Sequence, residues 1–245
     1  MDREGRVCVG VFDSGIGGMT LLAECRRRMP SVRFYYYGDN GNAPYGGKSK
    51  AELLSLSRRV LGLFALIGTD AVLLACNTVT TACVEDLRKE YAFPVVGTEP
   101  ALRAAAGCEN LLVLATAATL KSGEYARLQR ERAGHTVCFA PEKLVAAIER
   151  NAPFFKKIGM ADHLPALHPD GVVLGCTHFV YLKKYIEKFY GAPCFDGNEG
   201  TAKQLKRVIF AQKNAPSMPE KEGDVVFLGN FKVVNAYRYK QMFSF

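Results

Sequence analysis

Two cysteines each end a hydrophobic run and are followed by side chains that can form hydrogen bonds. The two segments are Cys76-Asn77-Thr78 and Cys176-Thr177-His178. A helix N-terminus at such a position lowers the pKa of a cysteine from about 8.5 towards 7, which makes the thiolate a strong nucleophile or base. Two thiols could exchange protons with opposite faces of one carbon. A Cys/His hydrolase instead needs one thiol and a third group that orients the histidine, and none is evident beside His178.

The two cysteines also occupy matching positions in a repeated segment. Residues 70–78 (DAVLLACNT) and 170–178 (DGVVLGCTH) align without a gap, and each is followed by a helix-length stretch and a proline-led strand. A repeat of this kind indicates a duplicated structural unit. Ligands of open α/β sheets bind beyond the carboxyl ends of the strands, so two facing units would bring Cys76 and Cys176 into one cleft.

A glycine-rich turn follows the first predicted strand. It comprises residues 13–18 (DSGIGG) and opens a helix, so its backbone N–H groups suit a carboxylate or a phosphate. A dinucleotide-binding fingerprint fits only in part, because Thr20 stands where the third glycine belongs, although Asp39 after the second strand could bind a ribose. The pair Asp13-Ser14 is better suited to tuning a base or binding an ammonium group than to lying beside a pyrophosphate.

A second polar loop covers residues 38–49 (GDNGNAPYGGKS) and ends like a phosphate-binding P-loop. The spacing of that motif requires a glycine where Asn42 stands, so we exclude a P-loop. We interpret the loop as a rigid segment that presents the backbone groups of Pro44, Tyr45 and Gly46 to a substrate. Ser49 is expected to cap the helix that follows.

These segments lie among short hydrophobic runs that alternate with helix-length stretches, which is typical of parallel sheets with crossover helices. We predict strands over residues 7–12, 32–37, 71–75, 95–97, 111–115, 136–139, 172–175, 193–195 and 224–228. We predict helices over residues 19–29, 49–67, 80–91, 99–107, 120–134, 142–151, 179–189 and 200–211, and a loop over residues 215–219. The expected fold class is therefore α/β.

Composition and charge restrict the classes of function. The chain has 245 residues, of which 49% are hydrophobic and 23% charged, and it has no long apolar run or leader-like segment, so we expect a cytoplasmic globular protein and no membrane contact. A nucleic-acid partner is not expected, because the densest basic run of this +8 chain, residues 26–28, is the end of a predicted helix. The eight cysteines lack zinc-site spacing, so we expect free thiols, no metal, and core positions for the six outside the motifs.

The ordered set of motifs resembles the glutamate racemases, within the wider aspartate/glutamate racemase superfamily. The set also includes residues 94–97 (PVVG), 115–119 (ATAAT) and 196–197 (DG), and it extends over nearly the whole chain. The resemblance implies a racemase without a cofactor, built of two pseudo-symmetric α/β domains with the active site in the cleft between them. It places the first domain at residues 1–97 and 208–245 and the second at residues 98–207.

The same resemblance implies a role for each motif. The catalytic residues would be the two acid/base thiols, Cys76 and Cys176, with the helpers Asp13, His178 and Glu149, the last through a weakly matching stretch. A small amino-acid substrate would be bound by Asp13, Ser14, Pro44, Tyr45, Gly46, Asn77, Thr78, Thr119 and Thr177. D-Glutamate made by such an enzyme would serve peptidoglycan synthesis, and a homodimer is compatible with the resemblance.

Some features depart from the family pattern, and other functions stay open. Phe179-Val180 stands where the family usually has an aromatic residue and then proline, and the tail from residue 223 matches poorly, which leaves the oligomer contacts undetermined. An aspartate racemase would keep the same reactive groups, whereas other chemistry of the superfamily would need only one cysteine. A basic binding module without catalysis is disfavoured, because every expected reactive residue is present.

Overall fold

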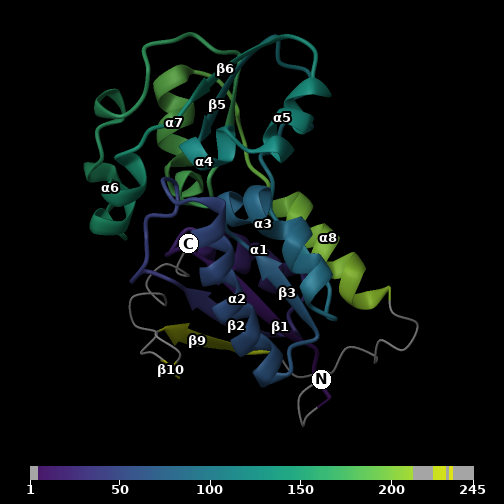
Figure 1. Ribbon diagram of the computed structural model, residues 1–245. Coiled ribbons are helices and arrows are strands. Elements are labelled where there is room, and N and C mark those ends of the chain that lie inside the picture. The colour runs from purple at the N-terminus through teal and green to yellow at the C-terminus, as the bar shows by residue number, and fades with distance from the viewer. Residues whose placement is uncertain (1–4, 212–222, 230–231, 234–245) are drawn as a thin grey trace.

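The protein contains two separate β-sheets, drawn one above the other in Figure 1. The computed structural model describes residues 5–211, 223–229 and 232–233. The strand order is β10-β9-β2-β1-β3-β4 in the first sheet and β6-β5-β7-β8 in the second. All neighbouring strands are parallel except β9 and β10, which are antiparallel. The α/β fold class with open parallel sheets is confirmed.

Nine of the described strands lie close to their predicted positions, and β10 was not predicted. The first sheet comprises β1 (Cys8–Asp13), β2 (Arg33–Gly38), β3 (Ala71–Leu74), β4 (Val95–Gly97), β9 (Val225–Gly229) and β10 (Lys232–Val233). The second comprises β5 (Asn110–Ala115), β6 (His135–Phe139), β7 (Gly171–Gly175) and β8 (Cys194–Phe195). The loop predicted over residues 215–219 lies outside the described residues.

Helices connect these strands and cover both sheets. The α-helices are α1 (Met19–Arg28), α2 (Lys50–Ile67), α3 (Asn77–Glu90), α4 (Ala117–Leu120), α5 (Gly123–Arg130), α6 (Leu144–Asn151), α7 (Lys183–Tyr190) and α8 (Asn198–Phe210). Three short 3₁₀ helices are η1 (Phe155–Lys157), η2 (Met160–Asp162) and η3 (Thr177–Leu182). None of the helices that the described residues form has both the length and the apolar character needed to cross a bilayer.

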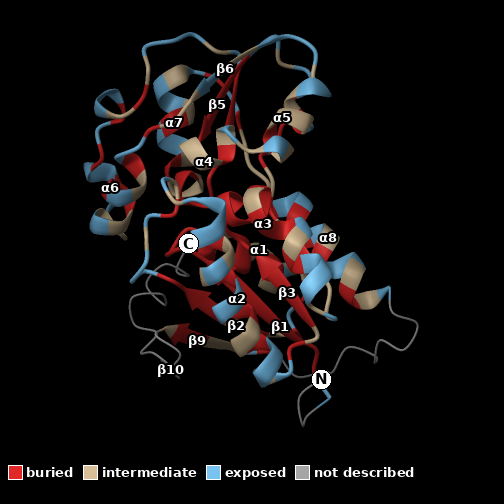
Figure 2. Cartoon of the chain, in the orientation of Figure 1, coloured by how far each residue is buried: buried red, intermediate tan, exposed pale blue. Residues whose placement is uncertain are grey.

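The strands form the buried interior of each unit. Figure 2 shows the strands largely red, whereas the outward faces of the helices are exposed. The central strands β1, β3 and β7 are buried at every residue, as expected of apolar strands covered on both faces. Of the six cysteines predicted in the core, four are buried. The prediction is wrong for Cys138, which is exposed on the edge strand β6, and for Cys108, which is half-buried.

The two sheets repeat one arrangement, in agreement with the repeated sequence. In each, the strand that leads to the cysteine (β3 or β7) lies between a central strand (β1 or β5) and a short edge strand (β4 or β8). The aspartates that begin the two repeats have the same role. The Asp70 carboxylate accepts a hydrogen bond from the backbone N–H of Cys8 (2.8 Å), and the Asp170 carboxylate accepts from that of Glu109 (2.7 Å).

One predicted helix is wrong. Residues 102–107 form successive tight turns, in which the N–H of Ala104 bonds to the carbonyl of Ala101 and the N–H of Cys108 to that of Ala105. Each of these bonds joins residues three apart in the sequence, whereas the bonds of an α-helix join residues four apart. Leu102 and Ala105 are buried against the second sheet, so tertiary packing overrides the high helix propensity of the alanines.

The helix predicted over residues 120–134 is shorter, α5 at Gly123–Arg130, and it is preceded by a short helix that was not predicted, α4 at Ala117–Leu120. The Ser122 hydroxyl accepts a hydrogen bond from the N–H of Tyr125 (3.1 Å) and so caps α5, while the Thr116 hydroxyl caps α4 by accepting from the N–H of Thr119 (3.2 Å). Serine and threonine favour such caps over helix interiors, because their side chains compete for backbone N–H groups.

The chain returns to the first unit after the second sheet. Helix α8 packs against α1, where the Asn198 amide donates to the Thr20 hydroxyl (3.0 Å), and β9 then pairs with β2. The predicted domain boundary between residues 207 and 208 lies inside α8. Most of the predicted tail, residues 230–231 and 234–245, is outside the described part of the chain.

Helix α2 begins at a reciprocal cap, as predicted for Ser49. The Ser49 hydroxyl accepts from the N–H of Glu52 (3.3 Å), and the Glu52 carboxylate accepts from the N–H of Ser49 (2.8 Å). We expect Ser49→Ala to lower the free energy of unfolding by about 1 kcal/mol, because a helix N–H loses its partner. Urea unfolding measures this loss. An unchanged midpoint would mean that water replaces the cap without cost.

Candidate active site

A cavity of about 300 Å³ lies where the carboxyl ends of the two sheets meet. Both Cys76 and Cys176 line it, one from each unit. Eight of the other predicted site residues also line this cavity: Ser14, Pro44, Tyr45, Gly46, Asn77, Thr78, Thr177 and His178. Asp13, Thr119 and Glu149 do not line it but contact residues that do.

Cys76 stands at the N-terminus of α3 in a buried, weakly polar environment. Its thiol donates a long hydrogen bond to the Ser14 hydroxyl (3.7 Å). Burial raises the pKa of Cys76 to about 12, and the negative charge of Asp13 adds to this effect, while a hydrogen bond from the N–H of Val79 opposes it. Cys76 is therefore the protonated thiol at neutral pH.

Cys176 has a different partner. Its sulfur lies 3.8 Å from Nδ1 of His178, and Nε2 of the same ring lies 2.8 Å from Oε1 of Glu149. Burial alone would lower the pKa of His178, but the hydrogen bonds with Cys176 and Glu149 outweigh it and hold that pKa well above its ordinary value. The imidazole of His178 therefore lies directly against the Cys176 sulfur.

The group that orients His178 is thus Glu149, which residue types and spacing alone did not reveal. It comes from α6, 29 residues before His178 in sequence. The same oxygen accepts a hydrogen bond from the N–H of Ile16 (2.9 Å), and the other oxygen accepts from the Asn40 amide (3.3 Å). Glu149 therefore joins the two units as well as holding the imidazole.

Asp13 lies behind the cavity and is fully buried. One carboxylate oxygen accepts from the N–H of Gly15 (2.8 Å) and the other from the Thr177 hydroxyl (3.3 Å). Asp13 is not the N-cap of α1, since Gly18 occupies that position. It affects Cys76 through its charge.

The backbone N–H groups of the glycine-rich turn do bind two carboxylates, but both carboxylates are side chains of the protein itself. The N–H of Gly15 bonds to Asp13, and the N–H of Ile16 bonds to Glu149. Glycine is required at this turn by close approach: a Cβ at Gly15 would lie 2.1 Å from Oε1 of Glu149, and one at Gly17 would lie 2.5 Å from Nδ1 of His178. Contact with the His178–Glu149 pair, not with a pyrophosphate, explains these glycines.

Asp39 fixes the second loop instead of binding a ribose. Its carboxylate accepts hydrogen bonds from the Tyr45 hydroxyl (2.6 Å) and from the Asn42 amide (3.0 Å). On the other side of the loop the carbonyl of Gly46 accepts from the N–H of Ala118 in the second unit (3.1 Å). The loop is therefore held rigidly at the cavity from both units.

Three threonine hydroxyls form a cluster between the units. Thr78 and Thr116 are 2.9 Å apart, Thr116 and Thr119 are 3.0 Å apart, and Thr78 and Thr119 are 3.5 Å apart. Of Thr116 and Thr119, it is Thr116 that lines the cavity, a position that our prediction gave only to Thr119. The ATAAT motif contains both residues, and only their placement in space distinguishes them.

The cavity offers hydroxyl, amide and imidazole groups but no lysine or arginine among the described residues that line it. Within the described ranges no group of three or more His, Cys, Asp or Glu side chains is arranged to hold a metal ion. Carboxylates of a ligand would therefore be bound by neutral donors, by backbone N–H groups and by His178.

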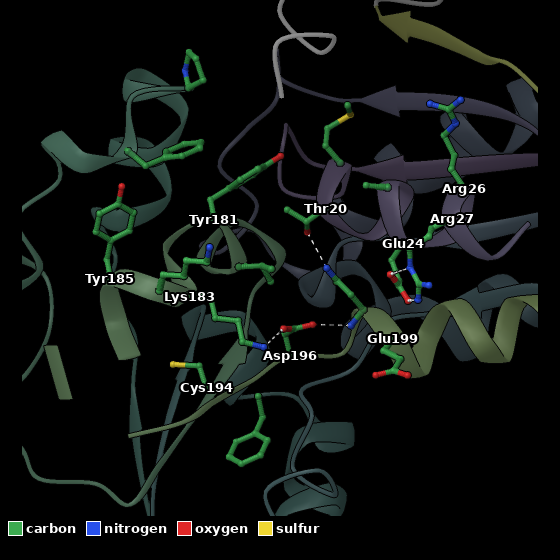
Figure 3. A pocket seen from close by; sticks show the side chains of 18 of the residues that line it. Thr20, Glu24, Arg26, Arg27, Tyr181, Lys183, Tyr185, Cys194, Asp196 and Glu199 are labelled. Atoms are coloured by element: carbon green, nitrogen blue, oxygen red, sulfur yellow. Dashed lines mark hydrogen bonds and ion pairs between the residues drawn. The ribbon is translucent and has the colours of Figure 1, made fainter. Parts of the chain in front are cut away.

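A larger crevice of about 1300 Å³ lies between α1, α7 and α8 (Figure 3). Several of its charged side chains pair with one another, as Lys183 does with Asp196 (2.9 Å) and Arg27 with Glu24 (2.8 Å). Neither Cys76 nor Cys176 lines it. Size alone would favour this crevice as the active site, but the two cysteines of the repeated motif line the smaller cavity.

The arrangement of two thiols in one cavity between two similar units agrees with comparisons with known proteins. The family model described as Asp/Glu/Hydantoin racemase matches residues 20–205. The chain belongs to this family. It is therefore a racemase, an isomerase by reaction class.

Relatives and solved structures of this family resemble the chain over nearly its full length. A glutamate racemase of Bifidobacterium animalis subsp. lactis is 38% identical, over 89% of this chain and 90% of its own. Glutamate racemase 2 of Bacillus subtilis is 35% identical, over 96% and 95%. The crystal structure of glutamate racemase from Thermus thermophilus in complex with β-chloro-D-alanine matches with a TM-score of 0.79 at 32% identity, over 98% of this chain and 93% of that one.

Proposed function

We propose that this racemase interconverts L- and D-glutamate by proton transfer between Cys76 and Cys176, without a cofactor. The observation that carries the proposal is the presence of both thiols in one cavity, each at the end of the equivalent strand of its unit. The names of the similar proteins support glutamate as the substrate. D-Glutamate made in this way would supply peptidoglycan synthesis, and we place the reaction in the cytoplasm.

The surroundings of the two thiols set their starting states. Cys76 begins as the thiol, since burial and Asp13 raise its pKa. We assign the role of first base to Cys176, whose sulfur lies 3.8 Å from Nδ1 of His178. The Cys176 sulfur takes the α-proton as the C–H bond breaks, and the resulting carbanion takes a proton from Cys76 on its other face. The thiolate and the thiol have then exchanged places. The family resemblance assigns Cys176 to the L-enantiomer and Cys76 to the D-enantiomer.

The protein must stabilise the negative charge that forms on the substrate. Preorganised dipoles in a site that excludes water do this better than water itself. We assign substrate binding to Ser14, Asn77, Thr78 and Thr177, to the backbone of the loop at Pro44, Tyr45 and Gly46, and to Thr119 acting through Thr116. His178 supplies the positive charge, and Asp13 and Glu149 set the surroundings of the two thiols.

Circular dichroism of amino-acid solutions tests the proposal. The enzyme, freed of small molecules by dialysis, is incubated separately with L-glutamate, D-glutamate and L-aspartate. We expect the signal of both glutamate solutions to decay to zero, and that of aspartate to decay at least about tenfold more slowly, since a pocket discriminates a missing methylene by that order. Stable glutamate signals would refute the reaction, and faster decay of aspartate would make the protein an aspartate racemase.

A further inference from the structure

Two tyrosine hydroxyls hold the turn that supports the His178–Glu149 pair. The Tyr36 hydroxyl donates to the carbonyl of Gly15 (2.7 Å), and the Tyr181 hydroxyl donates to the carbonyl of Ile16 (2.8 Å). Tyr36 comes from β2 in the first unit, whereas Tyr181 comes from η3 in the second and also lines the large crevice (Figure 3). Successive peptide groups of one turn are thus fixed from both units.

The position of these bonds within the turn gives them a specific effect. The carbonyl of Gly15 and the N–H of Ile16 belong to one planar peptide group and point in opposite directions. Tyr36 binds the carbonyl end of this group, and Glu149 binds its N–H end (2.9 Å). A hydrogen bond to the carbonyl orients the plane and also strengthens the N–H as a donor, because bonds in a chain polarise one another.

From Glu149 the contacts continue to the reacting sulfur. The oxygen that accepts from Ile16 is the one that contacts Nε2 of His178 (2.8 Å), and Nδ1 of that ring faces the Cys176 sulfur (3.8 Å). Cys76 contacts the start of the same turn, because its thiol bonds to the Ser14 hydroxyl. The two tyrosine hydroxyls bind further along the turn, at the carbonyls of Gly15 and Ile16, beside the N–H that holds Glu149. We therefore expect them to act mainly on Cys176.

We propose that Tyr36 and Tyr181 are positioning residues that orient the Gly15–Ile16 turn toward Glu149 and thereby hold His178 against Cys176. The inference rests on the proposed function for its effect on racemisation, but its effect on the reactivity of Cys176 is independent of any substrate. Neither tyrosine belongs to the motifs that indicated the active site, and neither lines the small cavity.

Replacing each tyrosine by phenylalanine isolates the hydroxyl group. The Tyr181 ring stacks on Phe155 and the Tyr36 ring packs near Phe227, and phenylalanine keeps both contacts. The titratable groups that face His178 are Cys176, Glu149 from α6 and Asp13 at the end of β1, and the substitutions alter none of them. A change in Cys176 reactivity would therefore arise from geometry.

The experiment measures alkylation of each cysteine by iodoacetamide, resolved by peptide mass spectrometry, from mildly acidic to alkaline pH. We expect Tyr36→Phe and Tyr181→Phe each to slow alkylation of Cys176 by about tenfold near neutral pH, the equivalent of one lost hydrogen bond, and to move its pH profile to higher pH. Alkylation of Cys76 should not change, and racemisation should fall in parallel with Cys176. Tyr190→Phe is the matched control, because its hydroxyl donates to the carbonyl of Pro165 away from the site (2.9 Å).

Each outcome decides the inference. Unchanged Cys176 profiles in both variants would reduce the two hydroxyls to a structural role, even if melting temperatures fell. Equal slowing of Cys76 and Cys176, or the same effect in Tyr190→Phe, would indicate general loosening and would also overturn it. A wild-type enzyme that fails to racemise glutamate, but whose Cys176 still responds to both variants, would refute the proposed function and leave the positioning role supported.

Discussion

Replacing either Cys76 or Cys176 by serine abolishes racemisation in both directions, with an expected fall in kcat of about 10³-fold or more. Serine has nearly the size of cysteine, so the cavity keeps its shape, but its hydroxyl is a far weaker acid. In the proposed mechanism every turnover uses both groups, because one removes the proton and the other returns it. Loss of one thiol therefore stops both directions equally.

The reaction in D2O separates this mechanism from single-cysteine chemistry. With two thiols, deuterium appears in the product well before it appears in the recovered substrate, as NMR or mass spectrometry of the two enantiomers would show. Cys138→Ser is the control, because Cys138 is exposed on β6 and does not line the cavity. Near wild-type turnover in one of the two active-site variants, with deuterium in substrate and product alike, would falsify the two-thiol mechanism.

Changing Glu149 to glutamine lowers kcat by about 10²-fold, the scale of a general acid or base that loses its correct protonation state. Glutamine keeps the shape of the side chain but not its charge. Without that charge the pKa of His178 falls towards its ordinary value, and the Cys176 sulfur loses its cationic neighbour. The alkaline limb of the rate profile should move to lower pH. Glu90→Gln, which removes a surface carboxylate paired with Arg58, should have no such effect.

The same variant has a consequence for stability. The pKa of His178 is higher in the folded than in the unfolded protein, so the imidazolium stabilises the fold fully below the unfolded pKa, and this contribution is lost as pH rises through the folded pKa. Urea unfolding of the wild type should therefore show a decrease in stability with rising pH above the ordinary histidine range, and Glu149→Gln should show a smaller decrease. Parallel slopes would mean that His178 titrates normally.

Local sequence patterns predicted the strands and the two sheets better than they predicted segments whose conformation depends on long-range packing. Alternating apolar runs predicted the strands within a residue or so, and the repeat at residues 70–78 and 170–178 predicted two equivalent sheets. The helix over residues 99–107 was wrong, because burial of Leu102 and Ala105 decides that segment and helix propensity does not. The buried strands can be recognised from short, continuous apolar runs, whereas the conformation of residues 102–107 depends on packing against the distant second sheet.

Sequence motifs indicated most of the residues that line the candidate site. They did not indicate the hydrogen bonds between residues far apart in the sequence. Glu149 contacts Ile16 across 133 residues, and Tyr181 contacts the same residue across 165. A tyrosine that bonds through its hydroxyl has no pattern in sequence that distinguishes it from one that only packs. The resemblance supplied Glu149 as a residue, but its position between His178 and the Ile16 backbone required the fold.

The two halves share a frame but surround their cysteines differently: His178 and Glu149 stand by Cys176, whereas Ser14 and Asp13 stand by Cys76. Enantiomers have equal free energy in solution, so the equilibrium constant of a racemisation is one, and the Haldane relation makes kcat/KM equal in the two directions. The unequal surroundings of the thiols cannot make the enzyme favour one product. They can appear only as matched differences in kcat and KM, so that the enantiomer with the higher KM is the one turned over faster at saturation.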